Sequence, residues 1–303
     1  MRKASRRARG TLGAGHFPGR EQWLPCPPMR RAVVLTALLG LVIPARAGTD
    51  LADEPDTAAH APLRAVSVYR IDLAWDIPVS VVAGAGIVVP YLMTDTLIHP
   101  HCPCPVSEVP WYDRWALGHA SDTADRVSTV TAGLAIAVPL ALDFADVGPS
   151  IPFLEDTTVF AQTLLVNGAL VTAAKYIVQR PTPRVYSPGL PAVVSSPSDY
   201  RSFYSGHTSL TFAALTAASM TWTLRHGSTW WPWVVTVVVG TSVGIERIYA
   251  GRHFPSDVLV GAAAGTVVGL AVPWLHSRGR LGPGTVEIEP LPGGAALAWS
   301  GPF

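Results

Sequence analysis

Charged residues are scarce in this chain of 303 residues: Lys, Arg, Asp and Glu make up 14% of it, whereas hydrophobic residues make up 49%. This composition is apolar for a water-soluble protein and favours a membrane protein or a helical bundle with an unusually large buried core. Positive and negative charges nearly cancel, leaving a formal net charge of +1. We therefore expect no nucleic acid among the partners, because that function needs an excess of positive charge.

Cysteine is also rare, with three residues in the whole chain. Cys102 and Cys104 are two positions apart in an expected loop, and this spacing would strain a disulfide between them. His99 and His101 are close in sequence, but no quartet of Cys and His with zinc spacing surrounds them. We expect a solvated loop here and no metal site.

The middle of the chain lacks the long alternation of apolar and polar residues that is typical of strands. Apolar segments of roughly 16 to 18 residues occur instead, a length near the lower limit for a membrane span. They lie at about 77–93, 127–142, 158–174, 208–224, 230–245 and 258–275. The sequence therefore predicts an all-α fold, a six-helix bundle that is associated with a membrane.

The N-terminal region has a different character. Residues 1–28 are rich in Arg, Gly and Pro without periodicity, and we expect a disordered or wrongly assigned leader. Met29 is followed by two arginines, an apolar run and Ala45-Arg46-Ala47, which is the pattern of a signal peptide over 29–47. An uncleaved anchor helix is the alternative for that segment.

The remaining chain divides by composition. Residues 48–70 are expected to form a linker and 71–280 the helical domain. Residues 281–303 contain short apolar runs around Pro-Gly-Gly and are expected to be a C-terminal tail, either a short hairpin or a frayed end.

Three polar clusters lie at the ends of apolar segments: Lys175 to Arg184, Ser202 to Ser209, and Glu246 to Asp257. Together they supply several cations, two histidines, an acid and a Ser-Gly turn. A tetrahedral oxyanion that undergoes group transfer needs this mixture of fixed positive charge, a nucleophile and a proton donor. In a bundle of six spans all three clusters fall on one side, so we expect them to form a single site.

Local chemistry supports this interpretation. Pro255 suits the first turn of a helix, which would let the carboxylate of Asp257 reach one imidazole nitrogen of His253 and leave the other free to attack phosphorus. Ser205 is a natural N-cap, and Gly206 lets the backbone N–H groups at the helix start approach a phosphate. Taken alone, each of these pairs is more typical of an ordinary helix cap, and only the three clusters together favour the catalytic interpretation.

The order and spacing of the clusters resemble the signature of the type 2 phosphatidic acid phosphatase (PAP2) and vanadium haloperoxidase superfamily. That signature reads Lys, six residues, Arg-Pro; then Pro-Ser-Gly-His; then Ser-Arg, five residues, His, three residues, Asp. The third cluster keeps the spacing of Arg247, His253 and Asp257. Tyr204 stands in place of the usual Pro, and Glu246 in place of the usual Ser.

The first cluster departs most from the signature. Thr182 occupies the position of its Arg, while Arg180 and Arg184 lie two residues to either side. One of these arginines is expected to supply the missing positive charge, and the sequence does not distinguish between them.

The resemblance implies catalytic roles for three residues. His253 would be the nucleophile that forms a phosphohistidine, Asp257 would orient it, and His207 would protonate the leaving alkoxide. The implied phosphate-binding residues are Lys175, Arg180, Arg184, Ser205, Gly206 and Arg247. No metal or other cofactor is expected, although vanadate would bind as a phosphate mimic.

The implied activity is that of an acid phosphatase or lipid phosphate phosphatase, acting on a phosphate monoester or pyrophosphate. The substrate would be a lipid such as phosphatidate or a polyprenyl pyrophosphate, or a small phosphate ester. A vanadate-dependent haloperoxidase is one alternative. A non-catalytic binding protein of the same fold is another; Thr182 in place of Arg raises this alternative, whereas the retained His207, His253 and Asp257 argue against it.

We expect the protein in a bacterial cell envelope, in the membrane or periplasm, with its active site facing outside the cytoplasm. A cleaved signal peptide, six full spans and an external site cannot all hold together, because the mature N-terminus would then begin outside. Asp113, His119, Asp122 and Asp125 lie between the first two apolar segments, where we expect a solvated loop rather than part of a substrate mouth.

Overall fold

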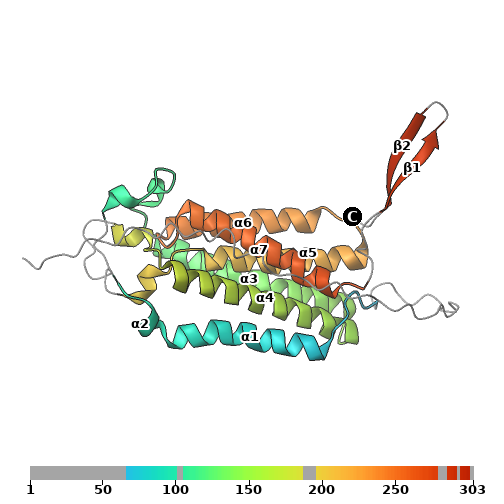
Figure 1. Cartoon of the computed structure of the whole chain (residues 1–303), viewed down its shortest axis with the longest axis horizontal. Helices are drawn as coiled ribbons and strands as arrows, with labels where there is room; N and C mark the ends of the chain where they lie inside the picture. The colour runs from blue at the N-terminus through green and yellow to red at the C-terminus, as the bar shows by residue number, and fades with distance from the viewer. Residues whose placement is uncertain (1–65, 101–104, 187–195, 279–284, 292–293, 301–303) are drawn as a thin grey trace, which may run out of the picture.

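A computed structural model describes residues 66–100, 105–186, 196–278, 285–291 and 294–300. Six long helices lie side by side along the long axis of the molecule (Figure 1), as the sequence predicts. They are α1 (Leu73–Leu92), α3 (Asp122–Val147), α4 (Ile151–Val178), α5 (Gly206–His226), α6 (Trp231–Tyr249) and α7 (Pro255–His276). The expected leader, the signal peptide, most of the linker, and Cys102 and Cys104 lie outside the described residues.

The helices are longer than the apolar segments from which they were predicted. α3 begins five residues before its apolar run, and α4 and α6 each continue four residues beyond theirs. The added turns carry polar side chains, among them Asp125, Lys175 and Arg247. The hydropathy of the sequence did not predict these turns as helical, because their side chains are polar. These side chains point into the end of the bundle where the three polar clusters meet.

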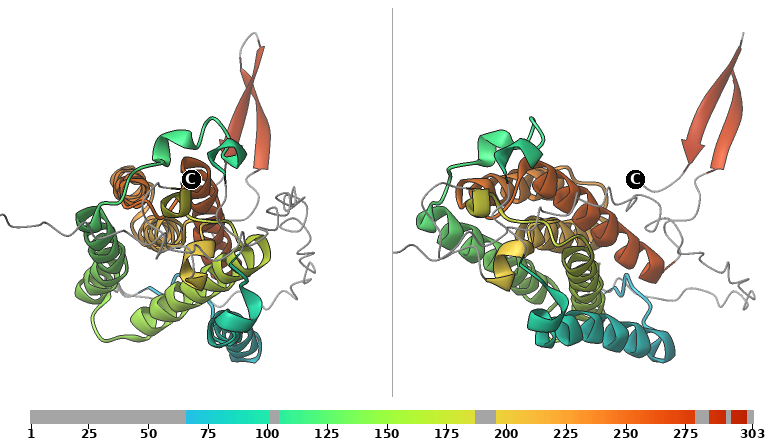
Figure 2. Two further views of the ribbon diagram at one scale, coloured as in Figure 1. Left: turned by 90° about the vertical axis from the view of Figure 1, so that its left-hand side faces the viewer. Right: turned by 60° about the vertical axis from the view of Figure 1, so that its left-hand side comes forward.

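α5 lies near the centre of the bundle, in contact with α3, α4, α6 and α7 (Figure 2). Glycines spaced four residues apart on α7 allow it to approach the α5 backbone closely. A Cβ atom built on Gly261, Gly265 or Gly269 would lie 2.7, 2.2 or 2.7 Å from a carbonyl oxygen of α5 or its N-cap. Small residues at this spacing let two helix backbones come into direct contact. The packing fixes the N-terminal ends of α5 and α7 beside each other.

Short elements gather at that same end of the bundle, on the left in Figure 1. They are α2 (Thr94–Leu97) and the 3-10 turns η3 (Val106–Glu108), η4 (Arg114–Ala116), η5 (Pro183–Tyr186) and η7 (Pro197–Tyr200). They connect the long helices around the region where the three polar clusters meet.

An ionic cluster ties the helices together at the opposite end. Arg225 of α5 donates to Asp143 of α3 at 2.8 Å and also to Asp156 of α4. Beyond the bundle, the tail forms an antiparallel hairpin of β1 (Thr285–Leu291) and β2 (Gly294–Ser300), in which Ile288 pairs with Leu297.

Four helical segments are long and apolar enough to cross a membrane: Leu73–Leu92, Asp122–Val147, Ile151–Tyr186 and Pro255–His276. α5 and α6 are not among them. Many large apolar side chains on the outer surfaces of α1, α3, α6 and α7 are exposed in the isolated chain. A bilayer would cover such surfaces, so the bundle has the character of a membrane protein.

Candidate active site

His253 lies in the short connection between α6 and α7, where its imidazole is buried. The chain reaches it through a turn at Gly251, which has φ of +67°; a Cβ atom there would lie 2.1 Å from the carbonyl oxygen of His119. Nδ1 of His253 is 2.7 Å from the backbone carbonyl oxygen of Ser202. Because a carbonyl only accepts, Nδ1 carries the proton and Nε2 keeps its lone pair. This tautomer suits a nucleophile.

Asp257 does not make the direct contact with His253 that the sequence suggested. Its Oδ2 atom is 4.0 Å from Nδ1 and instead accepts from the Ser202 hydroxyl at 2.6 Å and from the Phe254 N–H at 3.0 Å. The reason is that α7 begins at Pro255, so His253 precedes the helix and the two residues do not have helical i,i+4 geometry. Asp257 therefore caps α7 and holds Ser202, whose carbonyl holds the imidazole.

Positive charge converges on the two histidines from three segments. Lys175, on the last turns of α4, donates to the carbonyl of Arg201 at 2.6 Å. Arg247 lies at the end of α6, and its Nε, like that of Arg252, is a buried donor without a hydrogen-bond partner in the described part of the chain. Burial, followed by the charges of Lys175 and Arg247, holds the pKa of His253 well below its ordinary range.

His207 lies in the first turn of α5, with Nε2 3.3 Å from the hydroxyl of Thr129 on α3. Burial lowers its pKa to about 4, and repulsion by Arg247 and Lys175 adds to the effect. Both imidazoles are consequently neutral in the empty site at pH 7. An arriving phosphate dianion would oppose the repulsion and favour protonation of His207.

Ser205 and Gly206 shape the start of α5. The Ser205 hydroxyl contacts the Thr208 hydroxyl at 2.8 Å, and its backbone N–H donates to the carbonyl of Asp257 at 3.0 Å. A Cβ atom on Gly206 would lie 3.3 Å from Val171 and 3.6 Å from the Lys175 side chain. Glycine thus lets α5 begin directly against the lysine, with the N-terminal end of the helix toward the site.

The two arginines that flank Thr182 have different environments. Arg180 donates to Asp113 at 2.7 Å and to Asp257 at 2.6 Å, so its guanidinium is bonded to two carboxylates. Arg184 donates through Nε to the carbonyl of Ala250 at 3.0 Å and lies 3.6 Å from Asp122. Thr182 is buried and its hydroxyl has no partner among the described residues. Of the two arginines, Arg184 has fewer carboxylate contacts.

Two acidic residues that we expected in a solvated loop belong to the site. Asp113 is 0% exposed, and Asp125 on α3 accepts from Arg247 and, at 3.0 Å, from Arg252. Asp122 is exposed, as expected, and His119 packs its ring edge-on against Tyr249. The expectation failed for Asp113 and Asp125 because each carboxylate meets a guanidinium that is more than 60 positions away in sequence.

The family model described as PAP2 superfamily matches residues 156–280, which contain all three polar clusters. This region of the chain is similar to the PAP2 superfamily. The matched region begins within α4 and ends just beyond α7, so the PAP2 signature accounts for the cluster-bearing half of the bundle. Asp113 and Asp125 lie outside it.

Curated relatives match over shorter segments. The lipid A 1-phosphatase of Porphyromonas gingivalis is 36% identical over 114 residues, which are 37% of this chain and 22% of the relative. The bacitracin transport permease protein BcrC of Bacillus licheniformis is 43% identical over 51 residues, which are 17% of this chain and 24% of the relative. The chain therefore spans less than a quarter of the length of each of these relatives.

Two solved structures are also similar to this chain. LpxE from Aquifex aeolicus is 26% identical with a TM-score of 0.38, covering 52% of this chain and 90% of that one. The transmembrane PAP2-type phosphatidylglycerolphosphate phosphatase from Bacillus subtilis is 19% identical with a TM-score of 0.38, covering 66% of this chain and 94% of that one.

Proposed function

We propose that this chain is a phosphatase that removes a phosphate group from a lipid phosphate monoester or pyrophosphate through a phosphohistidine at His253, without a metal ion. The observation that carries the proposal is the tautomer of His253. Its Nδ1 proton is engaged by the carbonyl of Ser202, and its Nε2 lone pair is left within the field of Lys175 and Arg247.

The reaction would proceed in two displacements. Nε2 of His253 attacks phosphorus, the P–O bond to the leaving group breaks, and His207 gives its proton to the leaving alkoxide. The positive charge that develops on the imidazole is stabilised by the Ser202 carbonyl. Neutral His207 then takes a proton from water, which attacks phosphorus; the N–P bond breaks and phosphate leaves. Lys175 and Arg247 neutralise the phosphoryl oxygens in both steps.

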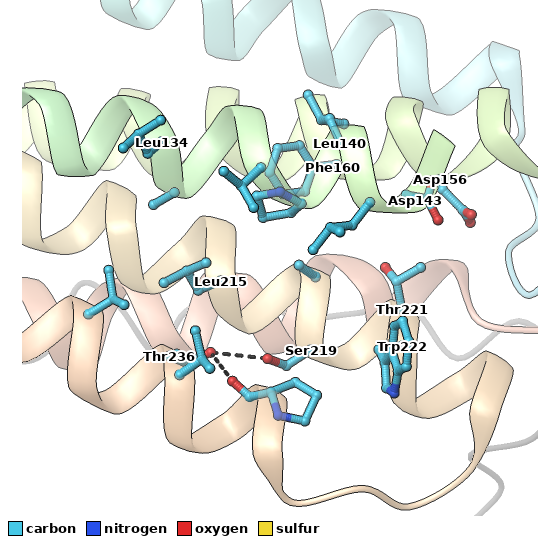
Figure 3. Close-up of a pocket in the computed structure, with 18 of the residues that line it drawn as sticks. Leu134, Leu140, Asp143, Asp156, Phe160, Leu215, Ser219, Thr221, Trp222 and Thr236 are labelled. Carbon is cyan, nitrogen blue, oxygen red and sulfur yellow. Dashed lines mark hydrogen bonds between the residues drawn. The ribbon is translucent and has the colours of Figure 1, made fainter. Parts of the chain in front are cut away.

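An apolar groove in the bundle supports the proposal that the substrate carries a hydrocarbon chain. It has a volume of about 340 Å³ and lies between α3, α4, α5 and α6, lined largely by apolar side chains such as Leu134, Phe160 and Leu215 (Figure 3). On α3 it starts at Thr131, two residues beyond the partner of His207, and continues to Asp146, about 22 Å at 1.5 Å per residue. A lipid whose phosphate sits at His253 could lay its chain there.

Exposed aromatic residues at both ends of the bundle support a location in the bilayer. Trp and Tyr side chains favour the two interfaces of a membrane. At the site end they are Trp111, Tyr112 and Trp115, and at the opposite end Trp75, Trp230 and Trp274. The site would then lie at one membrane surface, which we propose is the outer surface of the cytoplasmic membrane of a bacterium.

The test is phosphate release from phosphatidate, a polyprenyl pyrophosphate and a water-soluble phosphate ester, with acid-quenched enzyme examined for an acid-labile phosphoramidate. Release from the lipids together with a labelled His253 is expected. Bromide oxidation that requires vanadate, without phosphate release, would instead indicate a haloperoxidase, and neither activity a binding protein.

Binding of the hydrocarbon chain in the groove can be tested separately with a pair of variants. Leu134→Trp should raise KM for the lipid substrates about tenfold by filling the groove, and leave the water-soluble ester unaffected. Val267→Trp replaces an exposed apolar residue on α7 that does not line the groove, and should leave both KM values unchanged. Equal effects of the two variants would rule out the groove as the site of the hydrocarbon chain.

A further inference from the structure

Asp113 is buried although it lies in the connection between α2 and α3, outside the three polar clusters. Its Oδ1 accepts from the backbone N–H of Ser256 at 3.0 Å, and its Oδ2 accepts from the hydroxyl of Ser256 at 2.7 Å. Oδ2 also accepts from Arg180 at 2.7 Å. A buried carboxylate is retained only where such partners compensate for lost hydration, so Asp113 is firmly bound to the first turn of α7.

Arg180 connects Asp113 to the acid that follows the nucleophile. One terminal nitrogen donates to Asp113, and the other donates to Asp257 at 2.6 Å and to the Ser256 hydroxyl at 2.8 Å. The guanidinium carbon lies 4.1 Å from the centre of the Phe254 ring. The guanidinium therefore contacts two carboxylates, a hydroxyl and an aromatic face. These contacts stabilise the conformation of the chain around His253.

Direct contacts continue from Asp257 to the imidazole. Asp257 accepts from the Ser202 hydroxyl at 2.6 Å and from the Phe254 N–H at 3.0 Å, and the Ser202 carbonyl accepts from His253 Nδ1 at 2.7 Å. The loop that carries His253 is thus held on one side by Ser202 and on the other by the pair of acids on Arg180.

We propose that Asp113 is a positioning residue for His253, acting through Arg180 and Ser256, and that Arg180 positions the nucleophile rather than binding phosphate. The proposal rests on the proposed role of His253 as nucleophile. An amide in place of the Asp113 carboxylate keeps a single acceptor oxygen, so either the Ser256 N–H or Arg180 would lose its acceptor there. The direction of the Nε2 lone pair would then vary, and small misplacements of a reacting atom cost about 10- to 100-fold in rate.

The experiment compares Asp113→Asn with Asp122→Asn in detergent-solubilised protein. Asp122 is a matched control, because it is an acid nine positions later whose side chain is 82% exposed. Asp113→Asn should lower kcat about 10- to 100-fold while KM changes less than about threefold, since the phosphate ligands remain. Asp122→Asn should keep both constants. Ser256→Ala removes the hydroxyl contact but not the backbone one, and should lower kcat by a smaller factor.

Vanadate affinity supplies a readout that does not need turnover. Asp113→Asn should bind vanadate at least about tenfold more weakly than the parent and the Asp122→Asn variant. If the parent binds vanadate but releases no phosphate from any substrate, the proposed function fails and this comparison still tests the positioning role. Should Asp113→Asn not fold, the smaller loss of kcat in Ser256→Ala decides.

Three results would overturn the proposal. One is an unchanged kcat in Asp113→Asn. Another is a raised KM with kcat intact, which would make Asp113 part of substrate binding. The third is an equal loss in Asp122→Asn, which would reduce the effect to a general change of charge at this end of the bundle.

Discussion

Anion binding should be accompanied by proton uptake at His207. In the empty site burial, together with the charges of Arg247 and Lys175, lowers the pKa of this imidazole to about 4, whereas the ordinary value is 6.5. A bound dianion places negative charge beside the same cations and favours the imidazolium. If it returns the pKa to the ordinary value, protonation of His207 becomes about 3 kcal/mol more favourable in the complex.

The magnitude is set by these two values. At pH 5.5 a group with a pKa of about 4 is about 3% protonated and one at 6.5 is about 90% protonated, so binding should take up about 0.9 proton. At pH 7.5 the uptake by His207 should be about 0.1 proton. The affinity should therefore strengthen about tenfold for each unit of pH lost between about 6 and 4.5. The sign follows because the complex binds more protons than the free enzyme.

Sulfate is a suitable probe, because its own charge does not change over this range of pH. Calorimetric titration in two buffers of different ionisation enthalpy measures the proton uptake directly. His207→Gln should bind sulfate at pH 5.5 without most of this uptake, and any uptake that persists in that variant belongs to other groups of the site, such as His253. Sulfate binding with no proton uptake at pH 5.5, in protein shown to be folded, would refute the reasoning about His207.

Three further predictions concern the remaining site residues. His253→Ala should lower kcat by about three orders of magnitude or more in folded protein and abolish the phosphoramidate; appreciable turnover would exclude it as nucleophile. EDTA should leave the rate unchanged, because Lys175 and Arg247 stand where a metallophosphatase has carboxylate ligands; a loss restored by divalent metal would contradict this. Arg180→Ala should cost about 3–5 kcal/mol of stability by leaving buried Asp113 and Asp257 unpaired, whereas Arg184→Ala should have a small effect on the melting temperature and lower phosphate affinity.

The sequence was sufficient to predict the fold class and the meeting of three clusters. The spacing of Arg247, His253 and Asp257 and the Ser-Gly-His turn identified the PAP2 superfamily, and apolar segments located the six long helices. Hydropathy predicted helices that stop short of the site, because the first turn of α3 and the last turns of α4 and α6 are polar. These turns are helical in spite of their composition, since tertiary packing against α5 rather than an apolar face stabilises them.

The same sequence reasoning did not determine how the side chains pair. Asp257 was expected to contact His253 on the basis of its separation of four residues, and that inference assumed helical geometry throughout. The helix starts after His253, so the carboxylate caps the helix and reaches the histidine through Ser202. A proline at the first helical position already indicated where the helix begins, and applying this signal to the side chains would have predicted the cap.

The excess of positive charge in the three clusters is the signal in the sequence that would have predicted a role for Asp113 and Asp125. The clusters bring together five cations, Lys175, Arg180, Arg184, Arg247 and Arg252, and their own segments supply Glu246 and Asp257. Guanidinium groups that converge and become buried need carboxylate partners from elsewhere in the chain. Asp113 and Asp125, at the same end of the bundle, provide partners for Arg180, Arg247 and Arg252.

Lys175 differs from these arginines in that no carboxylate of the described chain lies within ion-pair distance of it, and its hydrogen bond goes to the backbone carbonyl of Arg201. A buried ammonium held by a neutral acceptor keeps most of its charge uncompensated. Together with the partnerless Nε donors of Arg247 and Arg252, it leaves the site with positive charge that the acids of the described chain do not absorb. A phosphoryl dianion would supply that missing negative charge beside His253. Asp125, which accepts from Arg247 and Arg252, therefore sets how much of their positive charge remains for the substrate.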